Sequence, residues 1–215
     1  MKKSILFLLI FVAFFLTSCI DSQLKKCENT QEANKIECFG DLAIERDDVS
    51  VCSEIETRTD SYYCMIIFAE SKEDTSICDD MITRYEHDTC YEKIAIKKKD
   101  ASICDSIQSS FGRDACPFKV ITSIARDNRD ETICNQIVSQ IYEGQSQHYR
   151  EQCISSVALE KNDITLCHKI TSDSLAADCY TLIATLRKDV DVCNNIEDPK
   201  WCINYVTDKM ETDKG

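Results

Sequence analysis

The residues with the widest range of possible chemistry in this sequence are its fifteen cysteines. A thiol can carry redox chemistry, bind a metal, accept a lipid or form a disulfide. Redox catalysis and most metal clips use Cys-x-x-Cys, but the closest cysteines from Cys27 onward, Cys193 and Cys202, are nine positions apart. The haem motif Cys-x-x-Cys-His is also absent. The spacing therefore favours structural cysteines over redox, metal or haem chemistry.

The three histidines have no partner at the spacing of a metal site or a catalytic triad. We expect His87 in a turn, and His168 on the surface of a helix. A recurring aspartate precedes six cysteines and could suggest calcium, but no Asp-x-Asp-x-Asp-Gly loop accompanies it. Helix capping is the favoured interpretation. These patterns predict a protein that is not an enzyme and has no metal or cofactor.

The N-terminus has the pattern of an export signal. Lys2 and Lys3 precede an apolar run over residues 5–16, which is too short for the ~20 residues of a membrane span. The run ends in Leu-Thr-Ser-Cys19, which resembles a bacterial-type lipobox. We therefore predict a signal peptide over residues 1–18 and a lipid on Cys19. The alternative is ordinary secretion, with Cys19 as a spare thiol.

The composition and the net charge further restrict the possible fold class and the possible partners. Only four glycines and two prolines are present, which favours helices over a turn-rich β fold. The net charge is −13, and removal of residues 1–18 takes away two lysines and no acid, leaving −15. This acidity argues against nucleic acid and against an anionic lipid surface as partners. It is compatible with a basic partner or with cations, and also with simple solubility.

Two classes of cysteine alternate with a period near 26 residues. The first class follows Asp-x-Ser/Thr-x-Cys, with Asp191 in the Ser/Thr position before Cys193, and an apolar residue comes three positions after the cysteine. This is the pattern of a helix start. Its members are Cys52, Cys78, Cys104, Cys134, Cys167 and Cys193. Ser76 with Asp79, and Ser102 with Asp105, resemble capping boxes.

The second class lies four residues before an apolar position that is usually followed by alanine, which indicates one face of a longer helix. Seven units of short helix, turn and longer helix result, with degenerate ends as expected of capped arrays. Cys116 and Cys134 are four residues further apart than the repeat requires. Four residues are about one helical turn, so we predict a lengthened helix with Ile124 and Ala125 in the usual apolar-alanine position.

An exported chain meets oxidising conditions, so the fourteen cysteines after Cys19 should form disulfides. Pairing within each unit uses all fourteen cysteines, whereas pairing between successive units leaves Cys27 and Cys202 without a partner. The even number of cysteines therefore favours pairing within units. Its pairs are Cys27–Cys38, Cys52–Cys64, Cys78–Cys90, Cys104–Cys116, Cys134–Cys153, Cys167–Cys179 and Cys193–Cys202. Such bridges would stabilise hairpins that are too small to fold alone.

The phrases Asp-x-Ser-Ile-Cys-x-x-Ile and Cys-Tyr-x-x-Ile-Ala resemble cysteine-rich helical-hairpin repeats of exported archaeal and bacterial proteins over residues 27–207. The arrangement is also similar to disulfide-stapled Sel1-like repeats, although the period is shorter and their glycine signature is missing. The resemblance implies an all-α, solenoid-like stack of hairpins and no agreed activity.

The segment between Cys134 and Cys153 is the longest inside any unit, and its tip over residues 140–150 is the candidate partner-binding loop. Tyrosine and arginine are frequent contact residues, and insertions in solenoids often lie on the binding side. The candidate contact residues are Tyr142, His148, Tyr149 and Arg150. A tolerated surface insertion is the bland alternative, and the pattern favours it.

Together these patterns predict a signal peptide over residues 1–18, a lipidated tether over 19–26 and a cysteine-rich repeat domain over 27–210. The expected protein is an extracytoplasmic lipoprotein, held in a membrane by Cys19, that acts as a scaffold for a protein or peptide. A structural envelope protein without a specific ligand is the first alternative, and a metal-binding or enzymatic module is the second.

Overall fold

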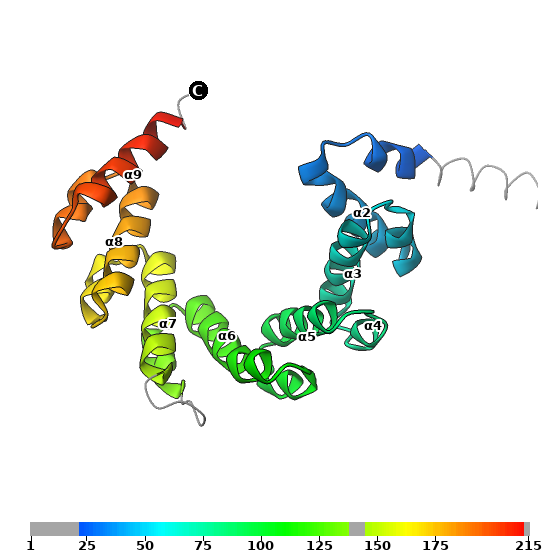
Figure 1. Cartoon of the computed structure of the whole chain (residues 1–215), viewed down its shortest axis with the longest axis horizontal. Helices are drawn as coiled ribbons and strands as arrows, with labels where there is room; N and C mark the ends of the chain where they lie inside the picture. Colours follow the sequence, from blue (N-terminus) through cyan, green and yellow to red (C-terminus); the bar gives the residue numbers. More distant parts are fainter. Residues whose placement is uncertain (1–21, 138–144, 213–215) are drawn as a thin grey trace, which may run out of the picture. The chain divides into compact units, whose positions relative to one another are not determined.

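The computed structural model describes residues 22–137 and 145–212, and every regular element within them is a helix. Longer helices alternate with short ones along the chain (Figure 1). The longer helices are α2 (Glu32–Arg46), α3 (Arg58–Lys72), α5 (Arg84–Lys98), α6 (Ser110–Asn128), α7 (Gln145–Lys161), α8 (Asp173–Arg187) and α9 (Lys200–Thr212). The all-α fold of short disulfide-linked hairpins is confirmed. The predicted signal peptide over residues 1–18 and residues 19–21 of the predicted tether lie outside the described residues.

The short helices are tight turns of helix. Of the six short helices that follow α2, five are 3₁₀-helices of six residues and one is a single α-turn. They are η1 (Val49–Glu54), α4 (Ser76–Asp79), η2 (Ala101–Ser106), η3 (Glu131–Gln136), η4 (Ile164–Lys169) and η5 (Val190–Asn195). A 3₁₀-helix rises about 2 Å per residue with three residues per turn, so six residues make two turns over about 12 Å.

The recurring aspartate is the N-cap of all five 3₁₀-helices, and α4 begins two residues after its aspartate, Asp74. All six of these carboxylates accept a hydrogen bond from the backbone N–H two residues later, at 2.9–3.0 Å. In four units the following Ser or Thr hydroxyl also donates to the same oxygen, as Thr165 does to Asp163 at 2.7 Å. This hydroxyl, and then the N–H, lowers the pKa of Asp163. The helix-capping interpretation of the aspartates is therefore correct.

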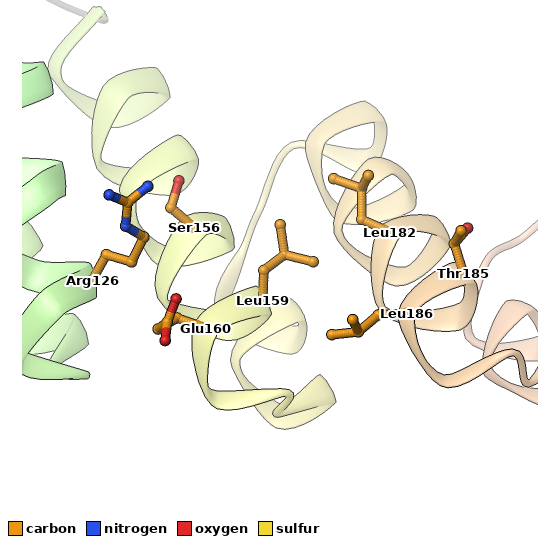
Figure 2. Close-up of a pocket in the computed structure, with 7 residues that line it drawn as sticks. All are labelled: Arg126, Ser156, Leu159, Glu160, Leu182, Thr185 and Leu186. Carbon is orange, nitrogen blue, oxygen red and sulfur yellow. The ribbon is translucent and has the colours of Figure 1, made fainter. Parts of the chain in front are cut away.

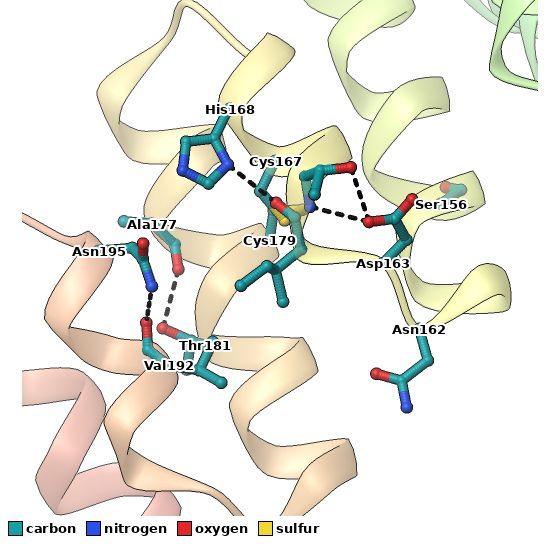
Figure 3. Close-up of a disulfide and its surroundings, with 12 residues drawn as sticks. Ser156, Asn162, Asp163, Cys167, His168, Ala177, Cys179, Thr181, Val192 and Asn195 are labelled. Atoms are coloured by element: carbon teal, nitrogen blue, oxygen red, sulfur yellow. Dashed lines mark hydrogen bonds between the residues drawn. A yellow bond between two sulfur atoms is a disulfide. The ribbon is translucent and has the colours of Figure 1, made fainter.

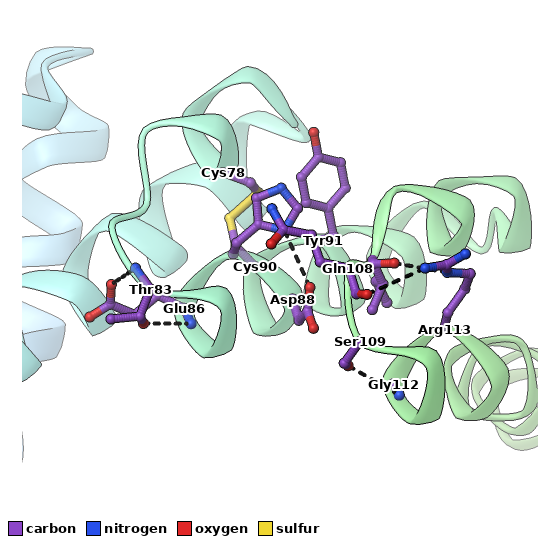
Figure 4. Close-up of polar contacts among 12 residues, drawn as sticks. Cys78, Thr83, Glu86, Asp88, Cys90, Tyr91, Gln108, Ser109, Gly112 and Arg113 are labelled. Atoms are coloured by element: carbon purple, nitrogen blue, oxygen red, sulfur yellow. Dashed lines mark hydrogen bonds and ion pairs between the residues drawn. A yellow bond between two sulfur atoms is a disulfide. The ribbon is translucent and has the colours of Figure 1, made fainter.

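The predicted capping boxes at Ser76 and Ser102 are wrong, because in both cases the preceding aspartate is the acceptor and the serine donates to it. A reciprocal capping box is present instead at the start of α5 (Figure 4). There the N–H of Thr83 donates to the Glu86 carboxylate at 2.9 Å, and the N–H of Glu86 donates to the Thr83 hydroxyl at 3.2 Å. Two backbone donors are thus satisfied by one pair of side chains.

Six of the seven longer helices, all except α9, end in a left-handed residue. Six non-glycine residues have φ between 52° and 57°, and each lies between a longer helix and the aspartate that follows. They are Asp47, Glu73, Lys99, Arg129, Asn162 and Lys188. In five of these ends the N–H of the aspartate donates to the carbonyl of the repeat's alanine, for example Asp163 to Ala158 at 2.9 Å. This is the Schellman motif. Its backbone hydrogen bond links the recurring alanine of the longer helix to the recurring aspartate that follows.

The seven disulfides follow the within-unit pairing, with Cα–Cα distances of 5.5–5.8 Å. These distances lie inside the window of roughly 4.4–6.8 Å that an unstrained bridge occupies. Figure 3 shows the bridge between Cys167 of η4 and Cys179 of α8, beside the Asp163 cap. Nearly all of the bridged cysteines are buried, so the sulfurs form the centre of each hairpin.

The chain divides between Lys97 and Lys98 into two compact units. In the first unit, α2 packs on α3, and a core around Phe39, Leu42 and Ile55 forms between them. In the second unit, α6, α7, α8 and α9 pack in sequence, around a core that includes Val157, Ile183 and Val206. The predicted lengthening is confirmed, because α6 has 19 residues where α2, α3, α5 and α8 each have 15, and Ala125 is fully buried.

Candidate functional site

An open groove of about 490 Å³ on the second unit is the candidate site (Figure 2). It crosses three successive longer helices. Arg126 comes from α6, Ser156, Leu159 and Glu160 from α7, and Leu182, Thr185 and Leu186 from α8. Its volume lies within the range of about 300–1,000 Å³ that ligand pockets occupy. A surface of this kind suits a few apolar side chains of a partner.

Leucine side chains form the apolar side of the groove, and two of them are exposed. Leu182 is 46% exposed and Leu186 is 58% exposed, one helical turn apart on α8. They lie three and seven residues after Cys179, whereas the core of the same helix takes Ile183 and Ala184. The neighbouring helix supplies Leu159, which is partly buried against the core of the unit. Two leucines on α8 and one on α7 therefore border the groove.

The polar side of the groove carries opposite charges. Glu160 accepts from Arg129 at 3.3 Å, and that arginine is the left-handed residue that ends α6. Arg126 lies 3.7 Å from Asp127. All four side chains are at least 41% exposed, so solvent screens these pairs and each adds little to stability. Both signs of charge remain accessible to a partner beside the leucines.

The predicted contact residues do not form a loop in the described part of the chain. Tyr142 lies outside the described residues, and His148, Tyr149 and Arg150 lie in the first turns of α7. The Tyr149 ring packs on Phe118 of α6, with centroids 4.5 Å apart. The Arg150 Nε donates to the Ser146 carbonyl at 3.2 Å. The expectation of a loop at residues 145–150 is wrong, and Tyr149 has a packing role between two helices.

The histidines lie in three different environments. His87 is 9% exposed within α5, which corrects the expected turn, and its Nδ1 is 3.3 Å from the Asp88 carboxylate. His148 lies 3.0 Å from Gln152, and His168 is exposed on η4 as expected. Within residues 22–137 and 145–212, no group of three His, Cys, Asp or Glu side chains is arranged to hold a metal ion.

Glu151 of α7 is a buried carboxylate that the sequence patterns did not single out. It is 1% exposed and accepts from Gln147 Nε2 at 2.6 Å, from the Thr171 hydroxyl at 2.5 Å, and from the N–H groups of Thr171 and Ser172 at 3.0 and 3.2 Å. Burial opposes the charge on Glu151, but these hydrogen bonds outweigh it and lower its pKa. Glu151 therefore holds the start of α8 against α7, beside the helices that border the groove.

Comparison with protein-family models, with curated proteins and with solved structures found no significant match to this chain. Among the described residues, none of the helices combines the length and the apolar character that crossing a membrane requires. The seven disulfides indicate an oxidising, extracytoplasmic environment.

Proposed function

We propose that this protein is a lipid-anchored extracytoplasmic scaffold that binds a protein or peptide through the groove of α6, α7 and α8. The observation that carries the proposal is the exposure of Leu182 and Leu186 beside a groove of about 490 Å³. Soluble proteins seldom leave neighbouring large apolar side chains in a concavity without a use for them. The partner segment is expected to present two or three apolar side chains at helical spacing, as in other helix-in-groove recognition.

Selection from a displayed library of random peptides tests the groove with no partner chosen in advance. We expect enriched peptides to bind the oxidised protein and to lose at least about tenfold in affinity with Leu182→Asp plus Leu186→Asp, because charge then enters the apolar side of the groove. The matched control is Ile82→Asp, since Ile82 is 81% exposed on the other unit. Binding that survives the double change, or a library that yields no groove-dependent peptide, would refute the proposal and favour a structural envelope role.

The lipid anchor has a separate test. Leu-Thr-Ser-Cys19 after an apolar run supports lipid attachment at that thiol, and the seven disulfides leave Cys19 out of every pair. We expect an alkyne-labelled fatty acid to be incorporated into the protein in a bacterial host, and to be lost in Cys19→Ser with release of the protein from the membrane fraction. An unlabelled wild-type protein would instead show ordinary secretion.

A further inference from the structure

The first disulfide, Cys27–Cys38, is the least covered of the seven. Thirteen of the fourteen bridged cysteines are at most 3% exposed, whereas Cys38 is only partly buried. The last hairpin also ends the array, but its Cys193 and Cys202 are 0% and 1% exposed. The exposure of Cys38 therefore belongs to the first hairpin and is not a general property of a terminal bridge.

The first hairpin differs from the others in how its first cysteine is held. Cys27 lies in a helical segment over residues 22–28, where the later units have a short helix that follows the recurring aspartate. The Asn29 and Thr30 side chains donate to carbonyls of this same segment, at 2.7 and 3.0 Å. The next helix, α2, begins after Gln31, whose side chain makes no capping bond. The segment and α2 are thus separate elements that the bridge joins.

Noncovalent contacts also hold the segment on α2. The Arg46 guanidinium donates to Gln23 Oε1 at 2.7 Å, and Leu24 packs against the core that contains Phe39. A helix this short is well below the ~12–15 residues that an isolated helix needs in water. The segment therefore depends on its attachment to α2, and the bridge is the covalent part of that attachment.

We propose that Cys27–Cys38 is a site of thiol–disulfide exchange with a dithiol reductant, and that the attacked sulfur is that of Cys38. A thiolate of the reductant bonds to Cys38 Sγ, the Cys27–Cys38 bond breaks, and Cys27 leaves as a thiolate that takes up a proton. The second thiol of the reductant then attacks its own sulfur in the mixed disulfide and releases Cys38 as a thiol. Two electrons pass from the dithiol to the protein, and the dithiol becomes a disulfide.

The same chemistry discriminates between this bridge and the other six. Exchange requires that the thiolate reach the sulfur that it attacks. Both cysteines of each later bridge are buried, so a reductant reaches them only after the hairpin has opened locally. The Cys27–Cys38 bridge can therefore open while the rest of the fold stays intact.

Opening this bridge lengthens the connection to the membrane, a consequence that rests on the lipid anchor proposed at Cys19. Seven residues separate Cys19 from Cys27, a reach of at most about 25 Å. Twelve residues separate Cys19 from the start of α2 at Glu32, a reach of at most about 43 Å. The exchange itself needs no lipid, so its tests are independent of lipid labelling at Cys19.

Timed reduction of the oxidised full chain with dithiothreitol tests the selectivity. Any free Cys19 thiol is first blocked with N-ethylmaleimide, and thiols that appear later are trapped with iodoacetamide and mapped by mass spectrometry. We expect Cys27 and Cys38 to be alkylated at least about tenfold faster than any other cysteine, with helical circular dichroism retained. Alkylation of another pair at the same rate, or loss of helicity together with this pair, would overturn the proposal.

Reduced glutathione, a monothiol, tests which sulfur is attacked. It leaves a mixed disulfide on the attacked cysteine and a free thiol on the other, which iodoacetamide traps. Trypsin cuts after Lys35 and so separates the two cysteines into residues 27–35 and 36–46. We expect glutathione on the second peptide and the trapped thiol on the first. An equal or reversed distribution would overturn attack at Cys38.

Two paired variants test what the bridge holds. Cys27→Ser plus Cys38→Ser should raise hydrogen exchange over residues 22–31 and should show no alkylation in the time that opens the wild-type bridge. The matched control, Cys78→Ser plus Cys90→Ser, removes a bridge of the same unit whose cysteines are 0% exposed, and should keep the fast reaction. Fast alkylation in the first variant, or unchanged hydrogen exchange over residues 22–31, would overturn the proposal.

Discussion

Glu151 is the one carboxylate with almost no exposed surface in the described residues. Four donors surround it, two of them backbone N–H groups at the start of α8. The Ser172 side chain makes no cap to its own helix, so the carboxylate supplies that function from a neighbouring helix. A glutamine in its place would direct an NH₂ group at donors.

We therefore expect Glu151→Gln to lower the free energy of unfolding by about 2–3 kcal/mol, because charged hydrogen bonds are lost and buried donors are left unpaired. Glu160→Gln on the same helix is the control, since that side chain is 41% exposed and should change stability little. Urea unfolding followed by circular dichroism measures both. Equal midpoints for the two variants would show that the buried network does not stabilise the fold.

The same residue predicts a pH dependence. The folded-state pKa of Glu151 is lowered from 4.5, because the hydrogen bonds outweigh the opposing effect of burial. Its contribution is thus fully present above pH 4.5 and is lost as the pH falls through the lower, folded-state value. The difference in unfolding midpoint between wild type and Glu151→Gln should therefore shrink as the pH falls below 4.5. A difference that stays constant would contradict the assignment of charge to this site.

Tyr62 of α3 shows the opposite situation. It is 5% exposed, its hydroxyl has no partner in hydrogen-bond geometry, and burial raises its pKa to about 12 although the nearby Thr89 opposes the rise. Tyr62→Phe removes the unpaired hydroxyl, so we expect it to stabilise the protein by about 1 kcal/mol. Tyr63→Phe is the adjacent control, with 40% exposure and no expected change. Destabilisation by Tyr62→Phe would mean that the hydroxyl has a partner in solution.

At the scale of the element, the left-handed residues explain how successive longer helices are joined. Glycine is usual there, because other residues lose about 1–2 kcal/mol in this conformation. Several of these side chains contact the last turns of the next longer helix. Asp47 pairs with Lys72 at 2.6 Å, Lys99 with Asp127 at 2.9 Å, Arg129 with Glu160 at 3.3 Å, and Asn162 with Arg187 at 2.6 Å. Such contacts offset part of the backbone cost.

Glu73 has φ of 53° and no such contact. Glu73→Gly should stabilise the protein by up to about 1 kcal/mol, because the backbone strain is relieved and no pair is lost. Ser71→Gly, two residues earlier in the last turn of α3, should instead destabilise slightly, because glycine has a lower helix propensity than serine. Thermal unfolding of both variants measures the contrast. A loss of stability in Glu73→Gly would indicate that its side chain contributes in solution.

The sequence patterns predicted most elements but missed the start of α7. Residues 145–150 are polar and lie in an insertion, which suggested a loop, but they include good helix formers, and Tyr149 packs on Phe118. Some of the extra residues between Cys134 and Cys153 therefore belong to α7, and the others precede it in the sequence. The lengthening of α6 was predictable, because a four-residue insertion preserves helical phase.

At the scale of the whole molecule, the disulfides and the hydrophobic cores within the units share the stabilisation. Each bridge closes a loop of about 10–20 residues and contributes about 3 kcal/mol, mainly by restricting the unfolded chain. Whole domains are stable by only about 5–15 kcal/mol. Loss of two or three bridges in one unit therefore removes most of its stability.

We expect a phosphine reductant to abolish helical circular dichroism at room temperature, and oxidised protein in the same buffer to remain folded. Non-reducing peptide mapping of the oxidised protein should recover the seven within-unit pairs and no free thiol after Cys27. Retained helicity in the fully reduced chain would show that the stacked apolar faces are sufficient for folding.

Local spacing and parity in the sequence were enough to define the helical class, the repeat boundaries and the pairing of cysteines. Which surfaces stay open depends instead on how the hairpins stack. Leu182 is a leucine like many in helices, and only the packing of α7 beside α8 leaves it at the edge of a groove. Burial and neighbourhood are properties of the folded chain, and one-dimensional spacing does not encode them directly.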